Sequence, residues 1–73
     1  MQYGLTIKQL KILKYIKAYI LKNSVAPSYD EIKKATKLNS KSSVNKYIIA
    51  LEERGWIARI PARARSIRLL KSI

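Results

Sequence analysis

A run near the middle of the chain carries the short polar and basic side chains that hydrogen-bond to the edges of nucleic-acid bases. It reads Ser40-Lys41-Ser42-Ser43-Val44-Asn45-Lys46. An asparagine amide can pair bidentately with adenine, a lysine ammonium can donate to guanine, and a serine hydroxyl accepts either kind of partner. Taken alone, the run would be an ordinary helix start, because serine and asparagine favour such positions.

A helix expected over Lys41–Arg54 would hold these side chains together. Val44, Ile48 and Leu51 recur at steps of four and three, which predicts an apolar stripe facing inward. Ser40 can cap the first turn, and Gly55 suits the left-handed position that ends a helix. The opposite side of the first turns then faces outward. The predicted base-reading residues are Ser42, Ser43, Asn45 and Lys46.

A basic hairpin is expected directly after this helix. Trp56–Ile60 and Ser66–Leu70 are strand-like runs, and Pro61–Arg65 forms the tip between them. The tip would present Arg63 and Arg65 to phosphate or to a minor groove, because a guanidinium pairs bidentately with phosphate. A solubilising turn is the plainer interpretation. Trp56 is expected to pack between helix and hairpin.

A first helix is predicted near the N-terminus, over Ile7–Lys22, with Thr6 as its cap. Its lysines lie outside one apolar sector. That sector holds Gln9, Ile12, Leu13, Ile16, Tyr19 and Ile20. Leu10 and Leu21 form a second, narrower stripe. The hairpin or another helix would cover this stripe, or a second copy of the chain would.

A short helix is predicted between these two, over Tyr29–Thr36. Ser28 and Glu31 have the spacing of a capping box that would start it. It is expected to bury Ile32 and Ala35. Further expected core positions are Leu38, Ile67, Leu69 and Leu70. The dipole of this helix would also attract a phosphate. Together with the basic residues nearby, the predicted phosphate and wing contacts are Ser28, Tyr29, Ser40, Lys41, Arg54, Arg63 and Arg65.

The composition agrees with a polyanionic partner and excludes several other functions. The 73 residues carry 16 lysines and arginines against 4 acids, a net charge of +12, where about 2 to 8 is ordinary for a small domain. A nucleic acid would relieve the self-repulsion of such a charge. With no histidine, no cysteine and no glycine-rich phosphate loop, the sequence predicts no enzyme, no metal site, no cofactor and no small-molecule ligand.

The length predicts one domain spanning residues 1–73. No apolar run approaches the ~20 residues of a membrane span, and the N-terminus lacks the pattern of a signal peptide. We therefore expect no membrane partner and a cytoplasmic location, on the nucleoid when the chain is bound to DNA.

Several short motifs together resemble a known family. They are Leu5-Thr6-x-x-Gln9, Pro27-Ser28-x-x-Glu31-Ile32, Ser40-Lys41-Ser42-Ser43-Val44, Leu51-Glu52-Glu53-Arg54-Gly55-Trp56-Ile57 and Ala64-Arg65-Ser66-Ile67. Their order and spacing are similar to the N-terminal DNA-binding domain of the LexA repressors over essentially the whole chain. The resemblance implies a winged helix-turn-helix, mainly α with a small β-hairpin. It also implies that the family's base-reading positions fall on Ser42, Ser43, Asn45 and Lys46.

The chain departs from that family in two ways. Its base-facing positions differ from the acidic and asparagine-rich set of the best-known LexA repressors, and Lys46 would favour guanine over cytosine. LexA repressors also continue into a self-cleaving protease domain that dimerises them, and these 73 residues hold no Ser/Lys dyad for such a reaction. The chain is then either an excised domain or a free-standing small regulator.

The sequence therefore predicts a regulator of transcription, most simply a repressor, that reads double-stranded DNA by sequence. A homodimer is expected at least on DNA, because one reading helix covers few base pairs. Two alternatives stay open. One is a non-specific architectural nucleic-acid-binding protein driven by charge, and the other is a winged-helix module that binds a protein through its first helix or its hairpin.

Overall fold

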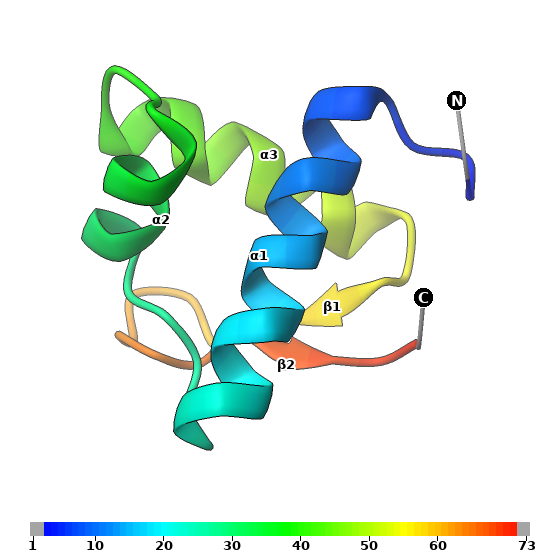
Figure 1. Ribbon diagram of the computed structural model, residues 1–73. Coiled ribbons are helices and arrows are strands. Elements are labelled where there is room, and N and C mark those ends of the chain that lie inside the picture. Colours follow the sequence, from blue (N-terminus) through cyan, green and yellow to red (C-terminus); the bar gives the residue numbers. More distant parts are fainter. Residues whose placement is uncertain (1–2, 72–73) are drawn as a thin grey trace.

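Three helices and a two-stranded sheet make up the computed structural model, which describes residues 3–71 (Figure 1). In chain order they are α1 (Ile7–Asn23), α2 (Tyr29–Thr36), α3 (Lys41–Glu53), β1 (Ile57–Ala58) and β2 (Arg68–Leu69). The strands are antiparallel, with Ile57 opposite Leu69. The predicted fold, mainly α with a small hairpin in the order of a winged helix-turn-helix, is confirmed. The predicted domain bounds include residues 1–2 and 72–73, which lie outside the described part.

All three helices begin at the predicted caps. The side chains of Thr6, Ser28 and Ser40 each accept a hydrogen bond from the backbone amide three residues later. The predicted and observed helix bounds differ by at most one residue at either end. After α3, Gly55 adopts a φ of 79°, the left-handed value that ends a helix without steric cost in glycine.

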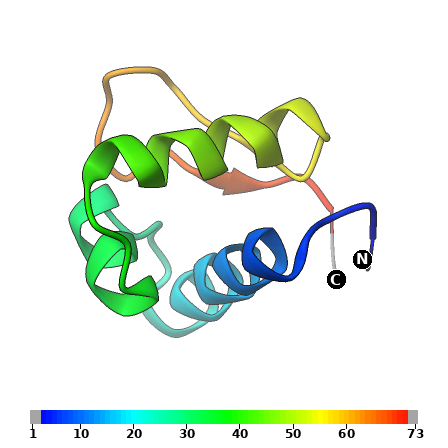
Figure 2. The same cartoon turned by 90° about the horizontal axis from the view of Figure 1, so that it is seen from above.

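The core lies where the three helices and the hairpin meet. Figure 2 shows α2 across one end of α1 and α3, with the loop of the hairpin at that same end. The predicted stripe of α3 is fully buried. The buried residues of the hydrophobic core cluster are Leu5, Ile12, Leu13, Ile16, Ala26, Ile32, Val44, Ile48, Leu51, Trp56, Ile57 and Ile67. Leu5, Ala26 and Ile57 were not predicted to belong to this set.

The prediction that certain residues would be buried in the core is wrong at several positions. Ala35 is exposed, because α2 buries only Ile32. Leu70 is 52% exposed and Leu21 is 74% exposed, so neither the hairpin nor a helix covers Leu21, whereas Leu10 does pack against the core. Gln9 does not serve the apolar sector. Its side chain accepts a hydrogen bond from the Thr6 amide and completes a second capping box.

The strands are shorter than predicted, because a side chain replaces the backbone ladder. The Ile60 amide donates to the Ser66 hydroxyl at 3.0 Å, and that hydroxyl donates back to the Ile60 carbonyl at 3.0 Å. This pair of hydrogen bonds joins the two ends of the loop between the strands. Pro61, which follows Ile60, has no backbone N–H and so could not continue the strand pairing. We call residues 59–67, between β1 and β2, the wing.

Candidate nucleic-acid interface

The starts of α2 and α3 lie next to each other. Lys41 Nζ is 3.3 Å from the Asp30 carboxylate, and the Tyr29 hydroxyl donates to Asn45 Oδ1 at 3.4 Å. The first contact joins two exposed side chains and is weak in water. The second engages the amide oxygen of a predicted base-reading residue and leaves the Asn45 amide nitrogen as a donor.

A groove of about 370 Å³ separates these helix starts from the wing. Its lining includes predicted contact residues from three segments of the chain. They are Ser28 and Tyr29 of the α2 start, Lys41 and Asn45 of the α3 start, and Arg63 and Arg65 of the wing. The charged lining is Lys41, Arg59, Arg63 and Arg65 against Asp30 alone. The groove is therefore positive overall and suits an anion.

The remaining predicted base-reading residues lie beside this groove on the first turns of α3. Ser42 and Lys46 are exposed, whereas Ser43 is half-buried. The Ser43 amide donates to the Ser40 hydroxyl at 3.2 Å, and the two hydroxyls are 3.4 Å apart. Ser42 and Lys46 thus have free access to a partner, and Ser43 serves the cap first.

Arg54 is the one predicted contact that the structure does not bring near the others. It caps the far end of α3, about 20 Å from the α3 start at 1.5 Å per residue. Its carbonyl accepts a hydrogen bond from Lys71 at 3.4 Å. A partner that touches the groove would reach Arg54 only by following the whole helix.

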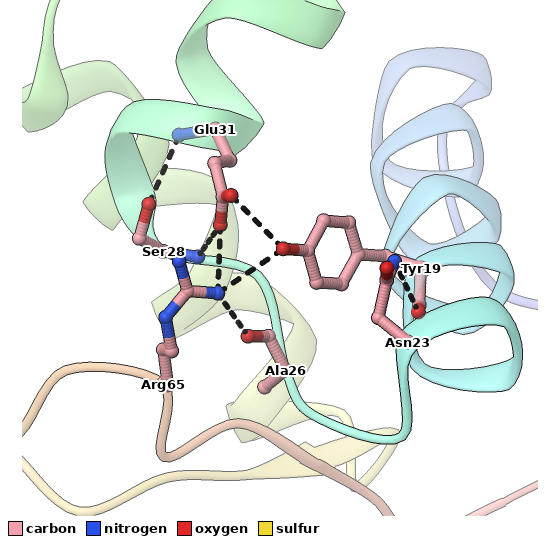
Figure 3. Close-up of polar contacts among 6 residues, drawn as sticks. All are labelled: Tyr19, Asn23, Ala26, Ser28, Glu31 and Arg65. Carbon is pink, nitrogen blue, oxygen red and sulfur yellow. Dashed lines mark hydrogen bonds and ion pairs between the residues drawn. The ribbon is translucent and has the colours of Figure 1, made fainter.

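The two arginines of the wing tip have different surroundings. Arg63 is exposed, and within residues 3–71 its side chain makes no hydrogen bond or ion pair. Arg65 turns inward (Figure 3). Its Nη1 is 2.9 Å from Glu31 Oε1, and it donates to the Ala26 carbonyl at 3.0 Å and to the Tyr19 hydroxyl at 3.2 Å.

This cluster, which we call the wing anchor, was not predicted from the sequence; its members are Tyr19, Ala26, Glu31 and Arg65. Glu31 was identified only as the acid of a capping box, and Tyr19 only as part of an apolar sector. No local pattern joins them, because Arg65 is 46 residues from Tyr19 along the chain. The available signal was chemical: Glu31 is one of only 4 acids in a chain of 16 cations.

The contacts within the wing anchor favour the charged forms of Glu31 and Arg65. Hydrogen bonds from the Ser28 amide and from the Arg65 guanidinium lower the pKa of the Glu31 carboxyl from 4.5 to about 2. The same contact with Glu31 raises the pKa of Arg65. The Tyr19 hydroxyl donates to the other carboxylate oxygen at 2.9 Å. Glu31 therefore stays ionised at any physiological pH.

A second ion pair ties the base of the wing to α3. Arg59 Nε is 3.3 Å from Glu52 Oε1, and the Arg59 side chain is largely buried. Although Arg59 lines the groove, its charge is already paired. The cations left for a partner in the groove are chiefly Lys41 and Arg63.

Within residues 3–71, no helix is long and apolar enough to cross a membrane. Nor do those residues hold a group of three or more acids, histidines or cysteines that could bind a metal ion.

Comparison with known proteins agrees with this geometry. The family model described as the LexA DNA binding domain matches residues 2–66. A LexA repressor of Erythrobacter litoralis (strain HTCC2594) is 45% identical over 67 residues. Those residues make up 92% of this chain and 29% of that repressor, so the chain spans less than a third of its relative's length.

Proposed function

This chain belongs to the LexA DNA-binding domain family, and on that premise we propose that it is a repressor domain that recognises double-stranded DNA by sequence. The observation that carries the proposal is the positive groove between the α3 start and the wing. It gathers donors and cations from three separate segments onto one side of a single domain. Such convergence is what a phosphate backbone entering beside a reading helix requires.

In this proposal, the first turns of α3 enter the major groove. Ser42, Asn45 and Lys46 supply hydrogen bonds to base edges. The Tyr29 hydroxyl holds Asn45 Oδ1, so that the amide nitrogen can donate to the N7 of a purine. Lys46 prefers guanine, which offers two acceptors to an ammonium group.

The phosphate backbone is held on either side of these bases. Lys41 and the positive end of the α3 dipole bind one phosphate, and Ser28 and Tyr29 reach the backbone beside it. Arg63 reaches a phosphate or the minor groove from the wing. Arg54, at the other end of α3, would serve a phosphate outside the central contact.

One such domain covers only a short site. We therefore propose that two copies bind a two-fold symmetric operator, with half-sites one or more helical turns apart, about 34–36 Å for one turn. A repressor of this kind acts in the cytoplasm, on the nucleoid. The wider activities of LexA repressors are not assigned to this chain, since it spans 29% of its relative.

The test is selection of bound duplexes from a random pool at physiological salt, using the 73-residue chain. We expect an enriched palindrome whose half-site spacing reports the geometry of the dimer. A single enriched half-site would keep the reading function and remove the dimer. Tight binding without enrichment would replace the proposal with charge-driven architectural binding, which the net charge of +12 makes the second candidate. No binding at all would favour a protein-interaction module.

A further inference from the structure

The outer part of the wing depends on one side chain for its polar contacts with the rest of the domain. The sheet that supports it has only two residue pairs, and a hairpin of that size has little stability of its own. The Ser66 bonds to Ile60 and the turn bond from the Arg63 amide to Ile60 stay within the wing. Among the described residues, every hydrogen bond or ion pair leaving residues 60–66 runs through Arg65.

Arg65 makes these contacts from a strained backbone. Its φ is 54°, in the left-handed region that is unfavourable for a residue with a side chain. A conformation of this kind persists only when the surrounding contacts outweigh the strain. The Arg65 side chain points toward Tyr19, Ala26 and Glu31 (Figure 3), although 44% of it stays exposed. Arg63 is also exposed, so the two arginines differ in their partners and not in their exposure.

The three acceptors around the Arg65 guanidinium belong to three different parts of the helical body. Glu31 lies in the first turn of α2, Tyr19 lies near the end of α1, and Ala26 lies in the loop between those helices (Figure 3). A single guanidinium nitrogen, Nη1, makes all three contacts. That nitrogen lies one bond farther from the backbone than a lysine ammonium would. One residue thus fixes the wing against both α1 and α2.

We propose that Arg65 is a positioning residue that locks the wing across the groove, so that Arg63, and not Arg65, is the wing cation that binds DNA phosphate. This inference rests on the proposed function. It reassigns Arg65, which the sequence predicted as a phosphate contact. The reason is competition. Taking Arg65 to phosphate would strip Glu31 of its cation and leave a carboxylate beside the polyanion.

The sharpest test removes the carboxylate without touching any cation that DNA could bind. Glu31→Gln keeps the capping box of α2, because a glutamine at that position caps α1 through Gln9 in the same chain. It also removes a negative charge, so simple electrostatics predict tighter DNA binding. We expect binding to the selected duplex to be weaker by about three- to tenfold, because only a fraction of the unbound molecules would then hold the wing in the docked position.

The matched control is Asp30→Asn, in the same turn of α2. This change also removes one negative charge, and it frees Lys41. We expect binding unchanged or up to about twofold tighter, the size of one charge about 10 Å from a phosphate in water. Circular dichroism melting of both variants checks that each still folds. Tyr19→Phe, which removes only a hydroxyl from the wing anchor, is a second probe and should weaken binding in the same direction as Glu31→Gln.

A salt titration separates a positioning residue from a phosphate ligand. Each lost phosphate contact lowers the slope of log K against log salt by about 0.9. We expect Arg63→Gln to lower the slope by that amount. Arg65→Gln should weaken binding at every salt concentration with the slope unchanged. Arg65→Lys should not restore it, because the lysine side chain is one bond shorter and its ammonium would stop short of the position of Nη1.

The outcomes that overturn the lock differ from those that overturn the proposed function. If the wild-type protein does not bind duplex DNA, the proposed function is wrong. If the wild type binds and Glu31→Gln binds as well or better, the lock is wrong. The lock is also wrong if Arg65→Gln lowers the salt slope by about 0.9 and Arg65→Lys restores it, since Arg65 would then be a phosphate ligand.

Discussion

The starts of α2 and α3 are built alike and behave differently. In each, a serine hydroxyl accepts from the amide three residues on at 3.2 Å, from Glu31 in α2 and from Ser43 in α3. In α2, Glu31 reaches back to the Ser28 amide at 2.7 Å and also holds Arg65. In α3, Ser43 reaches only the Ser40 hydroxyl, and the first turn holds no acid.

The two helix starts differ in which negative group lies at the positive end of the helix dipole. Two acids, Asp30 and Glu31, occupy the first turn of α2 and satisfy its dipole from within the protein. The first turn of α3 holds no acid, and in the proposed function a DNA phosphate takes that role. The residue three positions after the cap is therefore the point at which the two helix starts differ: a glutamate that holds Arg65 in α2 and a serine in α3.

The largest expected effect comes from truncating the exposed residues of the α3 start. Asn45→Ala with Lys46→Ala should reduce binding to the selected duplex by about 1–3 kcal/mol for each lost base contact, while random DNA loses only the smaller, sequence-independent attraction of one cation. Lys33→Ala with Lys34→Ala is the matched control, at the equivalent places after the α2 cap. It should weaken both duplexes equally. Competitive titration of the two DNAs measures the ratio, and an unchanged ratio in the α3 variant would contradict base reading there.

A smaller effect is expected when α3 is given the acid of α2. Ser43→Glu should raise the free energy of unfolding by about 0.5–1 kcal/mol, through the completed capping box. It should also weaken DNA binding by about 10- to 100-fold, because the carboxylate would face phosphate. Ser43→Gln caps without charge, so it should give most of the stability with much less loss of affinity. Equal losses for both variants would mean that the side chain's size, not its charge, matters.

The smallest expected effect is a titration, and it tests the α2 side of the comparison. The pKa of the Glu31 carboxyl is about 2 in the folded protein and 4.5 as an ordinary value. Because the folded pKa is the lower one, ionised Glu31 stabilises the fold above pH 4.5. That stabilisation is lost as the pH falls from 4.5 to 2. Arg65→Gln should raise the pKa of Glu31 toward 4.5 in a carboxyl carbon NMR titration. A midpoint that stays near 2 would assign the lowered pKa to the hydrogen bonds from Ser28 and Tyr19 and not to Arg65.

Sequence reasoning succeeded where the physical signal is local. The three caps, the buried stripe of α3 and the stop at Gly55 each depend on residues within a turn or two, so spacing alone determines them. It failed where contacts join distant segments. The wing anchor pairs Arg65 with Tyr19, and the short strands follow from Ser66 bonding to Ile60.

The predictions that Ala35 would be buried and that Gln9 would lie in the apolar sector were wrong for a different reason. Both residues lie near an apolar face in a helical projection. A projection does not say that α2 packs through Ile32 alone, nor that Gln9 sits at the third position after a cap. For the candidate interface, the residue types were predictable. Which of the two wing arginines is paired within the domain was not, because that depends on a carboxylate 34 residues earlier.

Trp56 gives the domain an optical probe. It is the chain's single tryptophan and is 7% exposed. Its ring packs edge to face on Tyr3 at 5.7 Å and lies 4.9 Å from the Lys71 ammonium, and its carbonyl accepts from Leu70. Trp56 is not among the residues that line the groove. Its fluorescence should therefore shift when the hairpin and the N-terminal segment separate on unfolding, and stay constant when DNA fills the groove. Stability can then be followed by emission in the same cuvette in which binding is followed by a label on the DNA.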